Sequence, residues 1–227
     1  MVKRALSSLA LIALCATAAF AASTPAPKLP DKPLPAEVAF VTSVQTELAK
    51  SFGTPEAAEK AGFFRYTNED KTGAISWVNP AWWNSTDVNH PSQLWYDVHG
   101  NLLGADYSVP MSQSATKPSK WGLNPERWFK FGAHVHYVYK DAAGHLVYGH
   151  AMRTKKFTDA GGDLSNPTAA TIVKLGLVKD ASQVVHVFAF PDLWDTEIWA
   201  KPNPKGAFAD SNPLVKPSTM AGKSMNM

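Results

Sequence analysis

The spacing of apolar residues along the chain changes once, near residue 63. Before that point, apolar side chains recur every three or four positions over residues 37–50, which predicts a helix that ends at Gly53. Thr54 and Pro55 are typical of a helix N-cap and a first helical position. A second, short helix is therefore expected to follow.

After residue 63 the pattern becomes that of strands. Short runs rich in aromatic and β-branched residues are separated by turn residues such as glycine and asparagine. A later helix is expected at 166–175, opened by Asn166-Pro167 and closed by Gly176. The runs predict strands at 63–69, 74–79, 93–98, 101–109, 127–139, 145–152, 182–190 and 196–200.

This order of elements indicates the fold class. Two helices precede many strands, and one further helix interrupts the strands near the end. We therefore expect an α+β domain built around a curved antiparallel sheet, with a few peripheral helices. A small barrel with peripheral helices is the alternative.

The N-terminal 21 residues match a secretory signal peptide. Lys3 and Arg4 precede an apolar run over 5–18, and Ala19-Phe20-Ala21 fits the small-x-small cleavage rule. Cleavage near Ala21 predicts a secreted or periplasmic protein. The alternatives are an uncleaved N-terminal anchor and, because of Cys15, a lipoprotein.

Three further segments are expected after the signal peptide. Residues 22–35 hold five prolines and predict an extended tether. Residues 36–215 form the expected single α+β domain, and residues 216–227 are expected to be a disordered tail. The tail contains methionines, whose thioethers are soft ligands of the kind that Cu(I) prefers, with chance occurrence as the alternative. They are Met220, Met225 and Met227.

Signal-peptide cleavage changes the composition. Removal of 21 of the 227 residues leaves 206, which is enough for one hydrophobic core, and takes away the only cysteine. Loss of Lys3 and Arg4 lowers the formal net charge from +3 to +1, which argues against nucleic acid as a partner. No later apolar run is long enough to predict a membrane span.

Four of the seven histidines fall within residues 134–150, which are predicted to form one β-hairpin. His134 and His136 are two positions apart on a strand, so they share a face with Cα atoms about 6.5–7 Å apart. Two imidazoles at that spacing can bind one copper or zinc ion. The alternatives are a non-metal binding or acid–base role and a purely structural role.

A metal site needs a third protein ligand. His186 is the leading candidate, because its neighbours on the same face of a predicted strand are apolar and indicate that it points inward. The carboxylate alternatives are Asp97, Asp106 and Glu197, none of which is tied to the hairpin by its spacing in the sequence.

The facing of the other two hairpin histidines depends on the register of the hairpin. A register that pairs Lys140 with His145 places Gly149 opposite His136 and puts His150 on the opposite face. A shift of one residue reverses the facing of His145 and His150.

Eight tryptophans are a high number for a chain of this length. An exposed row of them would stack on sugar rings, whereas buried tryptophans would only pack the core. We take Trp95, Trp128 and His150 as candidate ligand contacts. The acidic residues around Trp194 also permit the carboxylate pair of a glycosidase. They are Asp192, Asp195 and Glu197.

The sequence lacks the motifs of several enzyme classes, including the serine-hydrolase elbow, the zinc-protease helix and the glycine-rich phosphate loop. We therefore expect an exported binding protein of unknown ligand, with a transition metal at His134 and His136 as one candidate. The alternatives are a small exported enzyme that uses a histidine as general base, and a carbohydrate-binding protein that uses exposed tryptophans.

Overall fold

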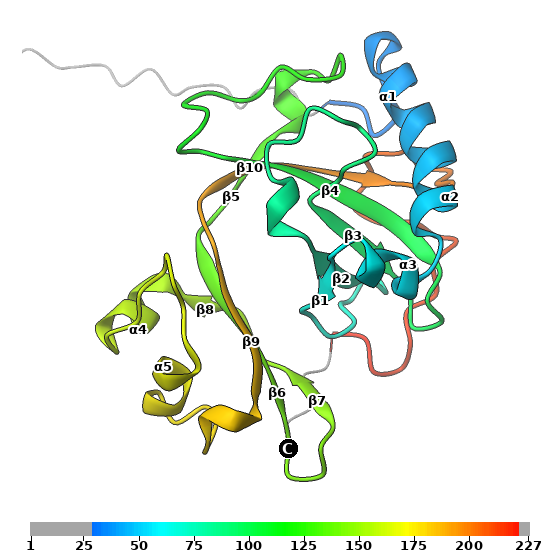
Figure 1. Ribbon diagram of the computed structural model, residues 1–227. Helices are drawn as coiled ribbons and strands as arrows, with labels where there is room; N and C mark the ends of the chain where they lie inside the picture. Colours follow the sequence, from blue (N-terminus) through cyan, green and yellow to red (C-terminus); the bar gives the residue numbers. More distant parts are fainter. Residues whose placement is uncertain (1–28, 223–227) are drawn as a thin grey trace, which may run out of the picture.

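The computed structural model describes residues 29–222 (Figure 1). The predicted signal peptide, most of the predicted tether and residues 223–227 lie outside the described residues. The described chain mixes helix and strand, with antiparallel sheets and few helices, so the expected α+β class is confirmed at that level. The strands form two sheets rather than one, and neither closes into a barrel, so the barrel alternative is wrong.

The larger sheet of the described chain has six strands in the order β1-β2-β3-β4-β10-β5, all antiparallel. Its strands are β1 (Phe64–Arg65), β2 (Ile75–Val78), β3 (Gln93–Tyr96), β4 (Leu102–Pro110), β5 (Phe129–Phe131) and β10 (Leu193–Trp199). In the smaller sheet, a central strand pairs with all the others. This central strand is β6 (His134–Lys140), and its partners are β7 (Leu146–Tyr148), β8 (Met152–Arg153) and β9 (Val184–Phe190).

A bent two-stranded ribbon joins the two sheets. β5 runs on into β6, β9 runs on into β10, and the two segments pair with each other on both sides of the bend (Figure 1). Phe131 pairs with Leu193 before the bend and His134 pairs with Phe190 after it, so one register runs through both sheets. The predicted single strand at 127–139 is therefore broken between its two sheets.

Helices cover the outer face of the larger sheet (Figure 1). A helical segment begins with a 3-10 turn (Pro35–Glu37), continues through α1 (Val38–Ser43) and a π-helical turn (Val44–Leu48), and ends with α2 (Ala49–Phe52). The predicted helix at 37–50 is thus confirmed, and its apolar stripe is buried against the sheet. The buried residues are Phe40, Val41, Val44, Leu48 and Phe52.

The short predicted helix is α3 (Pro55–Lys60), and the Thr54 hydroxyl accepts a hydrogen bond from the Ala57 N–H as its N-cap. Two more helices cover the outer face of the smaller sheet (Figure 1). α4 (Thr154–Asp159) was not predicted, and α5 (Ala169–Lys174) begins three residues later than the predicted start at 166. Phe157 and Ile172 are fully buried beneath these helices.

The inner faces of the two sheets meet at the bend of the ribbon. An aromatic cluster fills this corner and includes residues from both sheets. We call it the corner cluster. Its members are the buried Tyr66, Val78, Phe190 and Leu193 and the half-buried Phe64, Trp83, Phe131 and Phe188. Polar groups on the two inner faces are therefore separated by aromatic rings.

A buried ion pair fixes the N-terminal segment to the strand that leads into the bend. The Arg127 guanidinium donates to the Glu37 carboxylate, with a shortest nitrogen–oxygen distance of 2.9 Å, and both side chains are almost fully buried. Arg127 also donates to the carbonyls of Pro30 and Lys32, so the end of the predicted tether lies against the domain.

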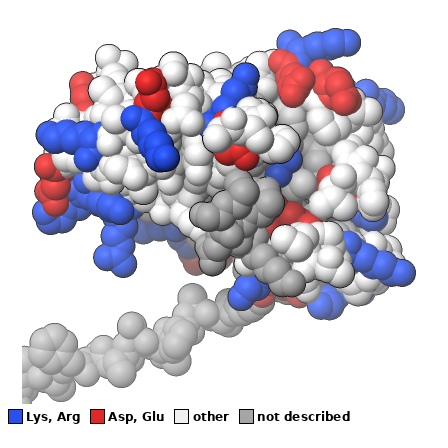
Figure 2. Space-filling view, turned by 90° about the horizontal axis from the view of Figure 1, so that it is seen from below, with Lys and Arg blue, Asp and Glu red and all other residues white. Residues whose placement is uncertain are grey.

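The predicted disordered tail is described as far as residue 222. The Ser218 amide and hydroxyl both donate to the carboxylate of Glu69, which places this part of the tail beside the strands near β1. No helix within residues 29–222 is long and apolar enough to cross a membrane. On the face shown in Figure 2, acidic and basic side chains are interspersed.

We predict that Arg127→Met destabilises the protein by about 3 kcal/mol, because it leaves the Glu37 carboxylate buried without its charged partner. Urea unfolding of the variant measures this change. The matched control is Lys117→Met, which removes a more exposed ion pair with Glu126 and should cost less than about 1 kcal/mol. Equal losses in the two variants would show that the buried pair has no special role.

Candidate functional site

The three histidines proposed as metal ligands share one face of the smaller sheet. His134 pairs with Phe190, His136 with Phe188, and Val138 with His186, so all these side chains lie on the same face. His136 is buried and His134 is half-buried, whereas His186 is exposed rather than pointing into the interior.

Aromatic rings surround each of these imidazoles. His134 stacks on Phe190 with ring centroids 4.7 Å apart, and His186 stacks on Phe64 at 4.7 Å. His136 stacks on Phe188 and meets the Tyr66 ring edge-on. Burial, followed by the nearby His134, lowers the pKa of His136 to about 3. His136 is therefore neutral at neutral pH and is a weak base.

His134 and His136 lie next to each other, with ring centroids 4.8 Å apart. His134 Nδ1 lies 2.7 Å from the Gly132 carbonyl oxygen, an arrangement that leaves Nε2 as the acceptor when Nδ1 carries the proton. However, residues 29–222 contain no group of three or more His, Cys, Asp or Glu placed to hold one metal ion. The structure thus brings the predicted pair together without a third protein ligand.

The hairpin register differs by one residue from the register considered above. Lys140 pairs with Leu146, and the Gly149 N–H donates to the Tyr137 carbonyl, so Gly149 lies opposite Tyr137 rather than His136. The ring of Tyr137 occupies the space that a side chain at Gly149 would need. His150 consequently lines a pocket together with His136, of about 210 Å³.

The tryptophans do not form an exposed platform. All eight lie within residues 29–222, and each is buried or half-buried. Trp128 is completely buried in the core and is not placed to contact a ligand there. Trp95 differs, because its ring lies across Gly104 on the neighbouring strand and lines a cavity.

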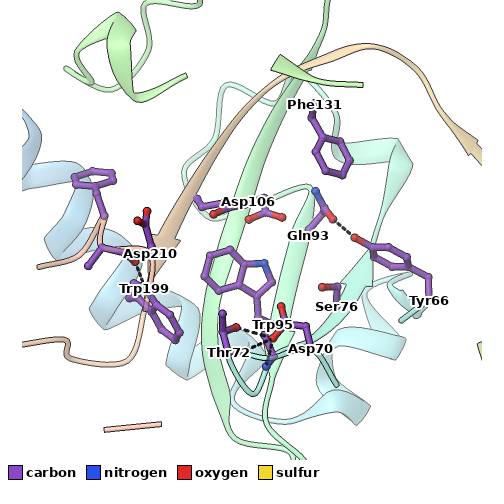
Figure 3. Close-up of a pocket in the computed structure, with 14 residues that line it drawn as sticks. Tyr66, Asp70, Thr72, Ser76, Gln93, Trp95, Asp106, Phe131, Trp199 and Asp210 are labelled. Atoms are coloured by element: carbon purple, nitrogen blue, oxygen red, sulfur yellow. Dashed lines mark hydrogen bonds between the residues drawn. The ribbon is translucent and has the colours of Figure 1, made fainter. Parts of the chain in front are cut away.

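This cavity, which we call the acidic pocket, lies on the inner face of the larger sheet and has a volume of about 190 Å³ (Figure 3). Buried polar side chains and Trp95 line it from β3 and β4, and the exposed carboxylates of Asp70 and Asp210 lie at its edge. Strand pairing explains the arrangement: Asp106 on β4 lies opposite both Gln93 on β3 and Glu197 on β10. These three side chains therefore share one face.

Two buried polar atoms that belong to the lining residues of the acidic pocket lack hydrogen-bond partners among the described residues. They are Asp106 Oδ1 and Gln93 Nε2, on side chains that are 6% and 1% exposed. The other end of the Gln93 amide is occupied, because the Tyr66 hydroxyl donates to Gln93 Oε1 (Figure 3). That hydrogen bond leaves the amide nitrogen as the free donor.

Burial and mutual repulsion disturb the carboxyl groups on this face. Burial, followed by the charges of Asp195 and Glu197, raises the pKa of Asp106 well above its ordinary value. Burial also raises the pKa of Asp195 to about 7, although the Ser108 hydroxyl donates to its Oδ1 at 2.8 Å. The pKa of Glu197 is raised by desolvation and then by the charges of Asp210 and Asp70.

The sequence indicated some of the residues of the acidic pocket but not that they lie together. Asp106 and Glu197 were considered as metal ligands, and Asp195 with Glu197 as a glycosidase pair, but nothing connected β4 with β10. Gln93 and Tyr66 were missed. The available clue was the spacing of two residues between Asp106 and Ser108 and between Asp195 and Glu197, because it places these polar groups on one face of each strand.

Comparison with known protein families, with curated proteins and with solved structures found no match for this chain.

We predict that the protein loses stability as the pH rises from about 5 to about 8. The pKa of Asp195 is about 7 in the folded state, against an ordinary value of 3.8, so the folded protein holds this proton more tightly than the unfolded chain. The stabilisation is complete at low pH and is lost as the pH rises through 7, with an upper bound of about 4 kcal/mol.

Thermal unfolding across this pH range measures the effect. Asp195→Asn keeps an acceptor for Ser108 but cannot ionise, so its midpoint should fall less with pH than that of the unchanged protein. Asp159→Asn, at an exposed position on α4, is the control and should follow the unchanged protein. A midpoint that rises between pH 5 and pH 8 would contradict the assignment.

Proposed function

We propose that this protein binds a small molecule in the acidic pocket. The observation that carries the proposal is the pair of unpartnered buried polar atoms, Asp106 Oδ1 and Gln93 Nε2, on the lining of a cavity. A buried polar group without a partner costs about 1–3 kcal/mol, and folded proteins rarely retain two such groups side by side. A bound ligand with hydrogen-bonding groups would offset that cost.

The size of the cavity supports a ligand larger than one water molecule. A single water needs only about 10–15 Å³ of such space, whereas the acidic pocket offers about 190 Å³. Its walls combine polar side chains with the rings of Trp95 and Phe131, the mixture that is typical of small-molecule sites. The exported location expected from the N-terminal sequence is part of this proposal.

Binding is favoured over catalysis by a histidine base. The low pKa of His136 makes it a poor proton acceptor, and the two histidine–carboxylate pairs found within residues 29–222 lie in surface turns. These pairs are His90 with Asp87 and His145 with Asp141. Neither pair contributes to the lining of the acidic pocket.

We predict that Asp106→Leu stabilises the ligand-free protein at neutral pH by about 1 kcal/mol, which is roughly 2–4 °C in the thermal midpoint. The substitution removes a buried polar atom that has no hydrogen-bond partner among the described residues. The matched control is Asp195→Leu, on the same face and equally buried, which should destabilise the protein because it leaves the Ser108 hydroxyl without its acceptor.

Differential scanning calorimetry of both variants without added ligand distinguishes a binding role of Asp106 from a structural role. A gain for Asp106→Leu together with a loss for Asp195→Leu supports a site kept for binding at the expense of stability. If both variants are destabilised to a similar extent, Asp106 has a structural role and the proposal loses its main support.

A transition-metal site at His134 and His136 is the second candidate function. The adjacency of the two rings favours it, as does His136 Nδ1, which is buried and has no hydrogen-bond partner among the described residues. With two protein ligands, copper or zinc would need further ligands from a bound molecule or from water.

We predict that, if the histidine pair binds metal, the mature protein retains about one equivalent of copper or zinc after dialysis. The double variant His134→Ala/His136→Ala should lose that metal, whereas His99→Ala/His145→Ala, at two exposed positions, should retain it. Elemental analysis of the dialysed proteins gives the answer. Equal metal content in the two double variants would rule out the pair.

A further inference from the structure

We infer that the ligand of the acidic pocket is a small organic molecule that carries both a protonated primary amine and hydroxyl groups. This inference rests on the proposed function and adds the chemical class of the ligand. It draws on three properties of the pocket: the sign of its charge, its aromatic surface and the kinds of hydrogen-bonding atom that it leaves unpartnered.

The charge of the lining is uniformly acidic. Four carboxyl groups line the pocket, and none of the lining residues is a lysine, arginine or histidine. Asp70, Glu197 and Asp210 are exposed, so they surround the entrance, whereas Asp106 lies deep. Such an arrangement attracts a cation and repels an anion.

The basic group that packs against the lining of the acidic pocket has its hydrogen-bond donors engaged elsewhere. The Arg127 guanidinium stacks on Phe208, 4.0 Å from the ring centroid, and Phe208 is a lining residue. However, Arg127 is buried and its donors are occupied by the Glu37 carboxylate and by two backbone carbonyls. Arg127 is therefore not available to pair with Glu197, whose pKa is raised first by desolvation and then by neighbouring carboxylates, and a bound cation would favour its charged form.

The geometry favours an organic cation over a metal ion. The carboxylates surround the pocket without converging, and no group of three within residues 29–222 is placed to hold one metal ion. Aromatic rings also line the pocket, including Trp95 and Trp199, whose centroids are 5.6 Å apart and whose planes are nearly perpendicular. Indole rings attract organic ammonium groups through their negative faces.

The unpartnered atoms indicate which kind of amine fits. A bound cation favours the ionised form of Asp106, whose Oδ1 then requires a hydrogen-bond donor, which a primary ammonium supplies and a quaternary ammonium lacks. Gln93 Nε2 requires an acceptor, which an ammonium lacks and a hydroxyl oxygen supplies. One molecule that bears both groups, such as an amino sugar or an amino alcohol, satisfies both atoms at once.

Isothermal titration calorimetry with glucosamine and glucose as probes tests this inference. The two sugars differ only in the amine, which is charged at about pH 6; phosphate buffer avoids a competing amine. We expect glucosamine to bind at least about tenfold more tightly than glucose, which corresponds to about 1.4 kcal/mol. Added salt should reduce the glucosamine affinity more than the glucose affinity, because exposed charges are screened.

Two variants identify the source of the preference. Glu197→Gln should weaken glucosamine binding by about tenfold and leave glucose binding unchanged, since it removes a charge at the entrance but keeps the shape of the side chain. Asp159→Asn removes an exposed carboxylate on α4, which covers the smaller sheet, and should alter neither affinity.

The outcomes separate this inference from the proposed function. Equal affinities for the two sugars, lost in Asp106→Leu, would overturn the amine inference and leave a pocket that binds neutral molecules. Absence of glucosamine binding would also overturn it, while the opposite stability changes of Asp106→Leu and Asp195→Leu would still support a binding site. Similar destabilisation of Asp106→Leu and Asp195→Leu would overturn the proposed function itself.

Discussion

The bent ribbon is the constraint on which the rest of the structure depends. Two segments of the chain, 129–139 and 184–195, pair with each other in both sheets, and one register holds from Phe129 to Val138 before it shifts at Tyr139. Because that register continues through the bend, the place of every side chain in one sheet determines the place of its neighbours in the other. The bend itself is held by the Ala133 N–H, which donates to Asp192 Oδ1 at 2.9 Å.

The bend brings two unlike polar surfaces close to each other, with aromatic rings between their buried groups. The smaller sheet presents His134 and His136 on its inner face, and the larger sheet presents Asp106 and Glu197. Tyr66 lies between them: its ring contacts His136, and its hydroxyl donates to Gln93. The corner cluster thus explains why the ring contacts of His134 and His136 among the described residues are with aromatic side chains and with each other.

The sequence allowed the local elements to be predicted better than their arrangement. The helix at 37–50 and the Thr54 N-cap could be recognised because their signals lie within a few residues. The break of the strand at 127–139 could not, since Gly132 and Ala133 resemble an ordinary strand interruption and the sequence does not show that the partner segment is interrupted opposite them, at 191–192. The register of the hairpin could not be decided from the sequence. A shift of one residue determines whether His150 lies on the same face as His136.

The acidic pocket could not be recognised in the sequence, because the residue pattern of its strands resembles that of a solvent-facing sheet. Polar residues stand two positions apart on β4, at Asp106 and Ser108, and on β10, at Asp195 and Glu197, which is typical of a sheet with one face in water. In this protein the polar face is partly covered, because the Trp199 N–H donates to the Ala207 carbonyl and brings residues 207–210 over the edge of the pocket. The spacing therefore places the carboxyl groups of Asp106 and Asp195 in a desolvated space rather than in solvent. Neither the acids nor the covering segment would form a site alone, and the two are about 100 residues apart along the chain, from Asp106 to Asp210.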